Sequence, residues 1–70
     1  MKLSARNQLK GKVHKVEKGA VNGIVQIDLG HGLVITSSIT NNAIDELGLK
    51  EGADATAVIK ASNVMIGVEE

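Results

Sequence analysis

The stretch VNGIVQIDLGHGLVITSSIT, residues 21–40, carries the pattern that decides the fold. From Val21 to Leu29, every second residue is apolar or glycine and the residues between are mostly polar, which is typical of a half-buried β-strand. Gly30-His31-Gly32 follows, and because glycine tolerates positive φ it predicts a tight hairpin. Residues 33–40 are predicted to be the returning strand.

The same alternation precedes this hairpin. Leu9, Gly11 and Val13 alternate with lysine and histidine, which predicts an earlier strand with one solvent-exposed face. Val16 breaks the parity of this pattern, which predicts a bulge or twist near residues 14–15. Residues 18–20 are predicted to be the turn into the next strand.

The segment after the hairpin changes character. Residues 40–42 offer helix N-cap side chains, residues 43–47 fit one short helical turn, and Gly48 is placed to end it. A turn at Glu51-Gly52 leads to two further predicted strands, residues 53–60 and 63–68. This order of elements predicts an all-β fold: a small five-stranded OB-like barrel with one short helix between strands 3 and 4.

The composition indicates one small domain, residues 1–70, whose own core is too small to make it stable without a further stabilising element. The chain has no Phe, Tyr or Trp to fill a core and no Cys for a disulfide. A domain of this size buries about 60% of the surface that its unfolded chain exposes, so its stability alone is marginal. Small scaffolds usually add a disulfide, a metal or a partner subunit. Because the first is excluded and two histidines make a poor metal set, we expect a homo-oligomer.

The charge balance argues against two classes of partner. Eight basic and eight acidic residues give no net charge, whereas nucleic-acid binding draws most of its affinity from basic residues. The base-stacking aromatic residues of OB-type nucleic-acid binders are also missing. No apolar run exceeds three residues, far short of the ~20 that span a membrane. Without a signal-peptide pattern, the expected location is cytoplasmic.

Catalytic and metal-binding patterns are not found in the sequence. His14 and His31 lie 17 positions apart and are interpreted as a solvated strand residue and a hairpin tip. The carboxylates fit helix-start, turn and tail positions, and the scattered glycines form no phosphate loop. We therefore expect no enzyme, no catalytic cofactor and no directly ligated metal.

One segment points to a ligand. SARNQLKGK, residues 4–12, contains hydroxyl, guanidinium, amide and ammonium donors and no carboxylate. Such a set suits a small oxyanion, which needs several N–H and O–H donors and no competing negative charge. Each residue also has a simpler interpretation, for example a turn for Ser4 or a surface ion pair for Arg6, worth at most about 1 kcal/mol.

Two separated segments of the sequence add support for a ligand-binding function. SARNQ at residues 4–8 and VIKASNVMI at residues 58–66 resemble signature segments of the molbindin (Mop, or TOBE-type) family. This resemblance extends over most of the chain. It implies a cytoplasmic protein that binds molybdate or tungstate reversibly at subunit interfaces for storage and homeostasis. It also implies a hexamer built as a trimer of dimers.

The resemblance further implies which residues contact the anion. From the two segments they are Ser4, Ala5, Arg6, Asn7, Lys60, Ala61 and Ser62. A hydroxyl-rich stretch of a neighbouring subunit would add Ser37, Ser38 and Thr40. Arg6 and Lys60 would balance the dianion, and without thiolates the metal would keep its own oxygens.

Two other functions remain open at this point. One is a molybdate-sensing module that regulates another protein, because related domains are attached to transporter ATPases and regulators. The other is a carrier of molybdopterin, although the chain offers no aromatic surface for stacking a pterin.

Overall fold

Residues 21–40 form the predicted hairpin in the computed structural model, which describes residues 1–70. Strand β2 is Asn22–Gly30 and strand β3 is Leu33–Thr40. The two loop residues, His31 and Gly32, have φ values of 55° and 77°. Positive φ at both positions is what a tight type I′ hairpin requires, so the predicted turn is confirmed.

Strand β1, Asn7–Lys18, pairs antiparallel with β2 on one side and with strand β4, Asp54–Ile59, on the other. The sheet order is therefore β3-β2-β1-β4. The β1–β2 register shifts between Val13 and Lys15, which leaves His14 as the extra residue. This is the predicted bulge, and it lets both Val13 and Val16 face the core.

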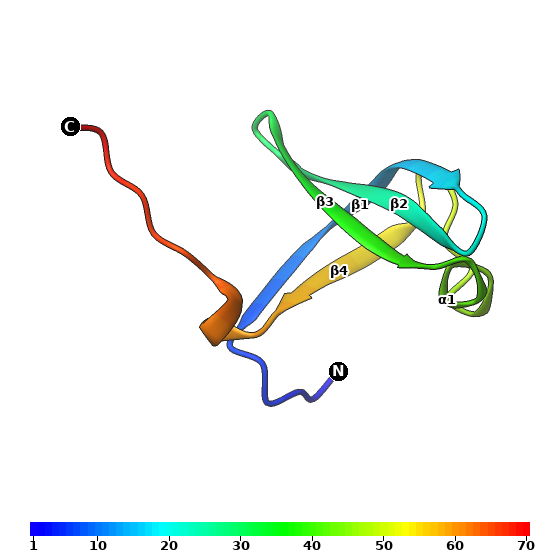
Figure 1. Cartoon of the computed structure of the whole chain (residues 1–70), viewed down its shortest axis with the longest axis horizontal. Helices are drawn as coiled ribbons and strands as arrows, with labels where there is room; N and C mark the ends of the chain where they lie inside the picture. Colours follow the sequence, from blue (N-terminus) through cyan, green and yellow to red (C-terminus); the bar gives the residue numbers. More distant parts are fainter.

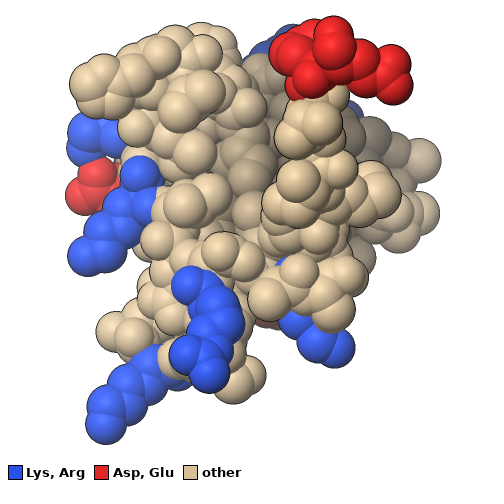
Figure 2. Space-filling view, turned by 90° about the vertical axis from the view of Figure 1, so that its left-hand side faces the viewer, with Lys and Arg blue, Asp and Glu red and all other residues tan.

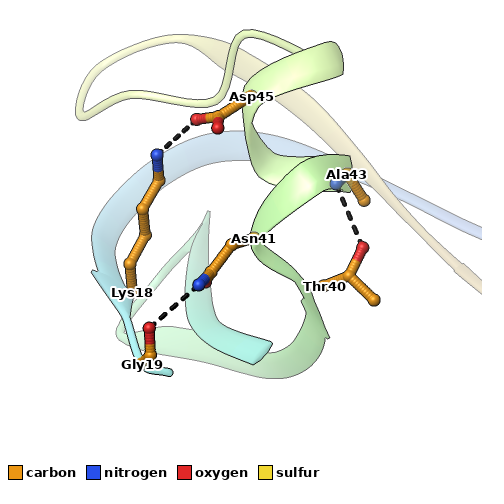
Figure 3. Close-up of polar contacts among 6 residues, drawn as sticks. All are labelled: Lys18, Gly19, Thr40, Asn41, Ala43 and Asp45. Carbon is orange, nitrogen blue, oxygen red and sulfur yellow. Dashed lines mark hydrogen bonds and ion pairs between the residues drawn. The ribbon is translucent and has the colours of Figure 1, made fainter. Parts of the chain in front are cut away.

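The sheet curls strongly, and helix α1, Asn41–Glu46, lies at the end of β3 (Figure 1). Thr40 is its N-cap: the side-chain oxygen accepts a hydrogen bond from the Ala43 N–H at 3.1 Å. Asn41 donates to the Gly19 carbonyl at 2.9 Å, and Lys18 pairs with Asp45 (Figure 3). These contacts tie the short helix to the turn between β1 and β2.

The core is very small. Five of the 70 residues are buried, and the four hydrophobic ones are Val13, Val25, Ile27 and Ile44. Ile44 reaches from α1 onto β2, where a Cβ on Gly23 would lie 2.6 Å from its Cδ1 atom. Gly23 thus leaves the space that the helix side chain fills. No helix of this molecule is long and apolar enough to cross a membrane.

The prediction of a fifth strand at residues 63–68 is wrong for the single chain. The structure has four strands, then a 3₁₀ turn at Ala61–Asn63, and no strand in residues 64–70. This last segment, which we call the tail, runs away from the sheet (Figure 1). A strand needs a neighbouring strand edge for its hydrogen bonds, and the tail has none. The observed fold is all-β with one short helix, a curled and open OB-like sheet.

Candidate functional site

The two donor-rich segments meet where β1 begins and β4 ends. Asn7 lies opposite Ile59 in the antiparallel register, and its side-chain Nδ2 donates a hydrogen bond to the Ile59 carbonyl at 3.2 Å. Arg6 precedes Asn7 and Lys60 follows Ile59. Because the strands are antiparallel, both cationic residues lie just beyond the same end of the ladder.

Short local hydrogen bonds shape the main chain on both sides of this end. The Asn63 N–H donates to the Lys60 carbonyl at 2.9 Å, and the Val64 N–H donates to the Ala61 carbonyl at 3.2 Å. On the other segment, Gln8 Nε2 donates to the Ala5 carbonyl at 3.2 Å. The side chains of Ser4 and Ser62 are exposed and donate to no other protein group.

Neither Arg6 nor Lys60 forms an ion pair with a carboxylate. The three ion pairs of the chain are Lys12–Asp54, Lys15–Glu17 and Lys18–Asp45. The sequence has no acidic residue before Glu17 and none between Asp54 and Glu69. The surface ion pair considered for Arg6 is therefore not formed. The end of the β1–β4 ladder carries two cations and several neutral donors with no opposing charge, which suits a dianion.

One carboxyl group has a perturbed pKa, and it lies at the other end of β4. The hydrogen bond from Lys12 and the charge of that lysine lower the pKa of Asp54 below its ordinary value. Both side chains are well exposed. The shift thus reflects a surface ion pair between Lys12 and Asp54, which lies at the end of the β1–β4 ladder away from Arg6 and Lys60.

Ser37, Ser38 and Thr40 do not join this cluster within one chain. Ser37 lies beside Val25 of β2, and Thr40 lies beside Asn22, toward the end of the sheet away from Asn7. Ser37 faces inward and Ser38 outward. The Thr40 hydroxyl oxygen already accepts the helix-capping bond. A contact between these hydroxyls and an anion held by Arg6 requires a second copy of the chain.

Sequence reasoning missed an apolar groove of about 630 Å³ between β3 and β4. Inward side chains of β2, β3 and β4 line it, and Leu47 and Leu49 lie at its α1 end. Its position could have been anticipated from the small residues Ala53, Ala55 and Ala57, which leave space on the inner side of β4. No group of three or more His, Cys, Asp or Glu side chains is placed to hold a metal ion.

Comparison with known proteins gives one consistent family. Residues 3–66 match the model of the TOBE domain. A probable molybdenum-pterin-binding protein of Haemophilus influenzae is 56% identical over 69 residues, which is 99% of this chain and 100% of that protein.

Two solved structures are also similar. MopII of Clostridium pasteurianum in an apo form has a TM-score of 0.89 and 49% identity, and the match covers 96% of this chain and 100% of that one. The cytoplasmic molybdate-binding protein ModG, solved with molybdate bound, has a TM-score of 0.94 and 56% identity. That match covers 99% of this chain and 49% of the ModG chain, so this chain spans about half of ModG.

Proposed function

The chain belongs to the TOBE domain family, and we propose that it binds molybdate reversibly, in the cytoplasm, for intracellular storage and homeostasis. The observation that carries the proposal is that two cationic residues, Arg6 and Lys60, lie at the end of the β1–β4 ladder and form no ion pair with a carboxylate. Relatives that match nearly the whole chain bear names of molybdate or molybdenum-pterin binding. The chemistry of the donor set agrees with those names.

Molybdate is a tetrahedral dianion, so its site needs about two positive charges and several directional donors. Arg6 and Lys60 supply the charges, and the guanidinium can donate two parallel hydrogen bonds to two oxygens. Ser4 and Ser62 can supply hydroxyl donors, and the main chain at Ala5, Asn7 and Ala61 can add N–H donors. The anion keeps its four oxygens and is held from outside, which makes binding reversible and requires no catalysis.

Tungstate has the same charge and shape as molybdate, and we propose that the site accepts both. Sulfate shares the charge and the tetrahedral geometry, but it is smaller. Donors set at the spacing of the larger ions make longer, weaker hydrogen bonds to sulfate, and hydrogen bonds weaken as they lengthen. Discrimination against sulfate therefore rests on the size of the site.

The site is completed between subunits in this proposal. One chain offers an exposed half-site, whose donors Arg6, Lys60 and Ser62 all face solvent. Ser37, Ser38 and Thr40 of a neighbouring copy are the candidate donors for the open side. A core of four buried hydrophobic residues gives a physical reason for assembly. We propose a homo-oligomer, with a hexamer arranged as a trimer of dimers as the expected form.

The experiment that tests the proposal is native mass spectrometry of the protein with molybdate, tungstate or sulfate at equal concentration. We expect a hexamer that gains whole numbers of molybdate or tungstate ions and little sulfate. A monomer that retains no ion, or equal uptake of all three ions, contradicts the proposal.

A second candidate ligand is a molybdenum-bound pterin, because the relative in Haemophilus influenzae is named for one. The apolar groove has room for a small molecule, yet no aromatic side chain is present to stack on a pterin ring. The near-ultraviolet spectrum of the purified protein separates the candidates. A protein without Trp, Tyr and Phe absorbs almost nothing there, so a bound pterin stands out directly.

A further inference from the structure

Asn22 is the only asparagine of the chain that precedes a glycine. In an Asn-Gly pair, the backbone nitrogen of the glycine can attack the amide carbon of the asparagine side chain, because glycine has no side chain to obstruct the approach. Asn22 is exposed, and its side chain makes no hydrogen bond within the chain. The amide carbon is therefore accessible, and the state of the Gly23 nitrogen decides whether the reaction proceeds.

The Gly23 nitrogen is held within the sheet. The Asn22 carbonyl accepts a hydrogen bond from the Gly19 N–H at 2.9 Å, on the β1 side of β2. A trans peptide unit points its N–H opposite to its carbonyl, so the Gly23 N–H is directed toward β3, where Ile39 is its register partner. β2 has a neighbouring strand on each side, which keeps its backbone extended. Attack on the side chain requires the Asn22 backbone to rotate out of this extended conformation.

Helix α1 covers the same glycine. A Cβ on Gly23 would lie 2.6 Å from Ile44 Cδ1 and 3.1 Å from Asn41 Oδ1. The Asn41 Oδ1 atom is buried, and Nδ2 of the same amide donates to the Gly19 carbonyl (Figure 3). The Gly23 backbone therefore has no room to move while α1 is docked. The same packing requires glycine at this position, so a larger side chain at residue 23 is not available to protect Asn22.

We propose that Asn22 is a deamidation site that the docked helix α1 keeps closed. When α1 lifts from β2, the Gly23 nitrogen loses its proton to a base, such as hydroxide, and forms a bond to the Asn22 Cγ atom. The bond between Cγ and Nδ2 breaks, and the released nitrogen takes up a proton and leaves as ammonia. The product is a cyclic succinimide that joins residues 22 and 23.

Water opens this ring at one of two bonds. Cleavage between the Gly23 nitrogen and Cγ gives aspartate in a normal main chain. Cleavage between that nitrogen and the main-chain carbonyl carbon gives isoaspartate, in which the chain runs through the side chain and gains one CH₂ group. The longer chain cannot keep residue 22 opposite Thr40, which is the N-cap of α1. Isoaspartate therefore prevents α1 from docking again in its original position.

The modified chain carries a new negative charge at an exposed position. Conversion of the amide to a carboxylate gives one excess negative charge to a chain that has no net charge. Charged side chains also project into solvent on the face drawn in Figure 2, where the acidic and basic groups lie largely apart. A carboxylate at residue 22 needs no burial, so the modified chain can still fold. Ion-exchange chromatography then separates it from the unmodified chain.

Peptide mapping by mass spectrometry measures the reaction at each asparagine. Wild-type protein is kept at one mildly alkaline pH, with and without guanidinium chloride. In the denatured chain we expect Asn22 to react faster than Asn42, which precedes an alanine. In the folded protein Asn22 should react at least about tenfold more slowly than in the denatured chain, because the reaction waits for local opening. Equal rates at Asn22 in the folded and denatured chains overturn the proposal.

A matched pair of core variants tests the role of α1. Ile44→Val and Ile27→Val remove the same carbon atom from side chains that are 2% and 6% exposed. Ile44 lies over Gly23, whereas Ile27 packs on Gly11. Each folded-state rate is divided by the rate of the same variant in guanidinium chloride. We expect Ile44→Val to raise this ratio at Asn22 about 2- to 10-fold and Ile27→Val to leave it close to the wild type. Equal acceleration by both variants, or by neither, overturns a closure by α1.

Hydrogen exchange of the isolated products tests the consequence for the fold. We expect the isoaspartate form to exchange faster in α1 than the unmodified protein. Asn22→Asp carries the same charge on a normal main chain and serves as the control, and its α1 protection should match that of the wild type. Equal protection of α1 in the isoaspartate form and the wild type contradicts the loss of docking.

Discussion

Asn7 and Ile59, 52 positions apart in the chain, are joined by a hydrogen bond from the Asn7 side-chain amide to the Ile59 carbonyl. This contact closes the β1–β4 ladder at the end where Arg6 and Lys60 emerge. Two segments that carry the proposed donors for an oxyanion are therefore positioned by one strand pair.

The first prediction concerns Arg6→Ala. Hydrogen bonds to a charged group contribute about 1.5–3 kcal/mol each, so losing the guanidinium should weaken molybdate binding by about 10- to 100-fold or more. Arg6 is exposed and makes no ion pair, so the thermal midpoint without ligand should not change. Isothermal titration with molybdate measures the loss. Lys15→Ala removes an exposed cation elsewhere on β1 and serves as the control; an equal loss in both variants would refute a specific role for Arg6.

A second prediction concerns the close contact of Gly23 with Ile44. Gly23→Ala places a methyl group 2.6 Å from the Ile44 Cδ1 atom and 2.9 Å from the Glu17 carbonyl oxygen. Overpacking of this kind costs about 1–3 kcal/mol. Ile44→Val removes the Cδ1 atom, so the double variant should be more stable than the sum of the single effects predicts. Chemical denaturation of the four proteins at one fixed concentration gives the coupling energy, and strict additivity would contradict the contact.

Thr40→Ala should destabilise the fold by about 1 kcal/mol, because the Ala43 N–H loses its capping acceptor. The loss should be local: hydrogen exchange should rise in α1, which holds Ile44 over the core, more than in β1 or β2. Ser38→Ala, an exposed hydroxyl on the same strand, is the control. Equal protection of α1 in the two variants would show that the cap contributes nothing.

The Lys12–Asp54 pair predicts a weak acid sensitivity. The pKa of Asp54 is lowered in the folded chain, so the pair stabilises the fold above the unfolded pKa of about 3.9. This contribution is lost as the pH falls through the lower, folded value. Asp54→Asn should therefore lower the free energy of unfolding at pH 7 and converge with the wild type near pH 2. Because the pair is exposed, added salt should shrink the difference at pH 7. A gap that persists at pH 2 would point to packing instead of charge.

Local patterns predicted the four observed strands and their turns for identifiable reasons. The parity break at Val16 marked the bulge at His14, and the glycines around His31 marked the hairpin. Thr40 was one of the residues offered as the helix cap, and Gly48 has the positive φ expected just after the helix. In each case the information lies in neighbouring residues, so a single sequence contains it.

The absence of a fifth strand from the single chain could not be predicted in the same way. Val64, Ile66 and Val68 do alternate as a strand does, yet a strand also needs a neighbouring edge to pair with. The 3₁₀ turn at Ala61–Asn63 leads this segment away from the sheet, so it has no such edge. The placement of Arg6 and Lys60 beyond the same end of the β1–β4 ladder likewise depends on the strand register, which local pattern does not specify. The similarity to a known family, not periodicity, linked these two segments. Whether the predicted contact residues hold the anion stays a prediction for Arg6→Ala to test.

The β1–β4 ladder also has a consequence for how this domain tolerates change in chain length. The ladder begins where Lys12 pairs with Asp54 and ends where Asn7 pairs with Ile59. Five further residues of each strand follow the Lys12–Asp54 pair. The number of residue pairs in the ladder, and not any donor side chain, places Lys60 and Arg6 beyond the same end. Adding or deleting a single residue in β4 turns alternate side chains to the opposite face and shifts Lys60 along the ladder. We expect such an insertion or deletion to disable the proposed site, as Arg6→Ala should, although every donor is still present in the sequence.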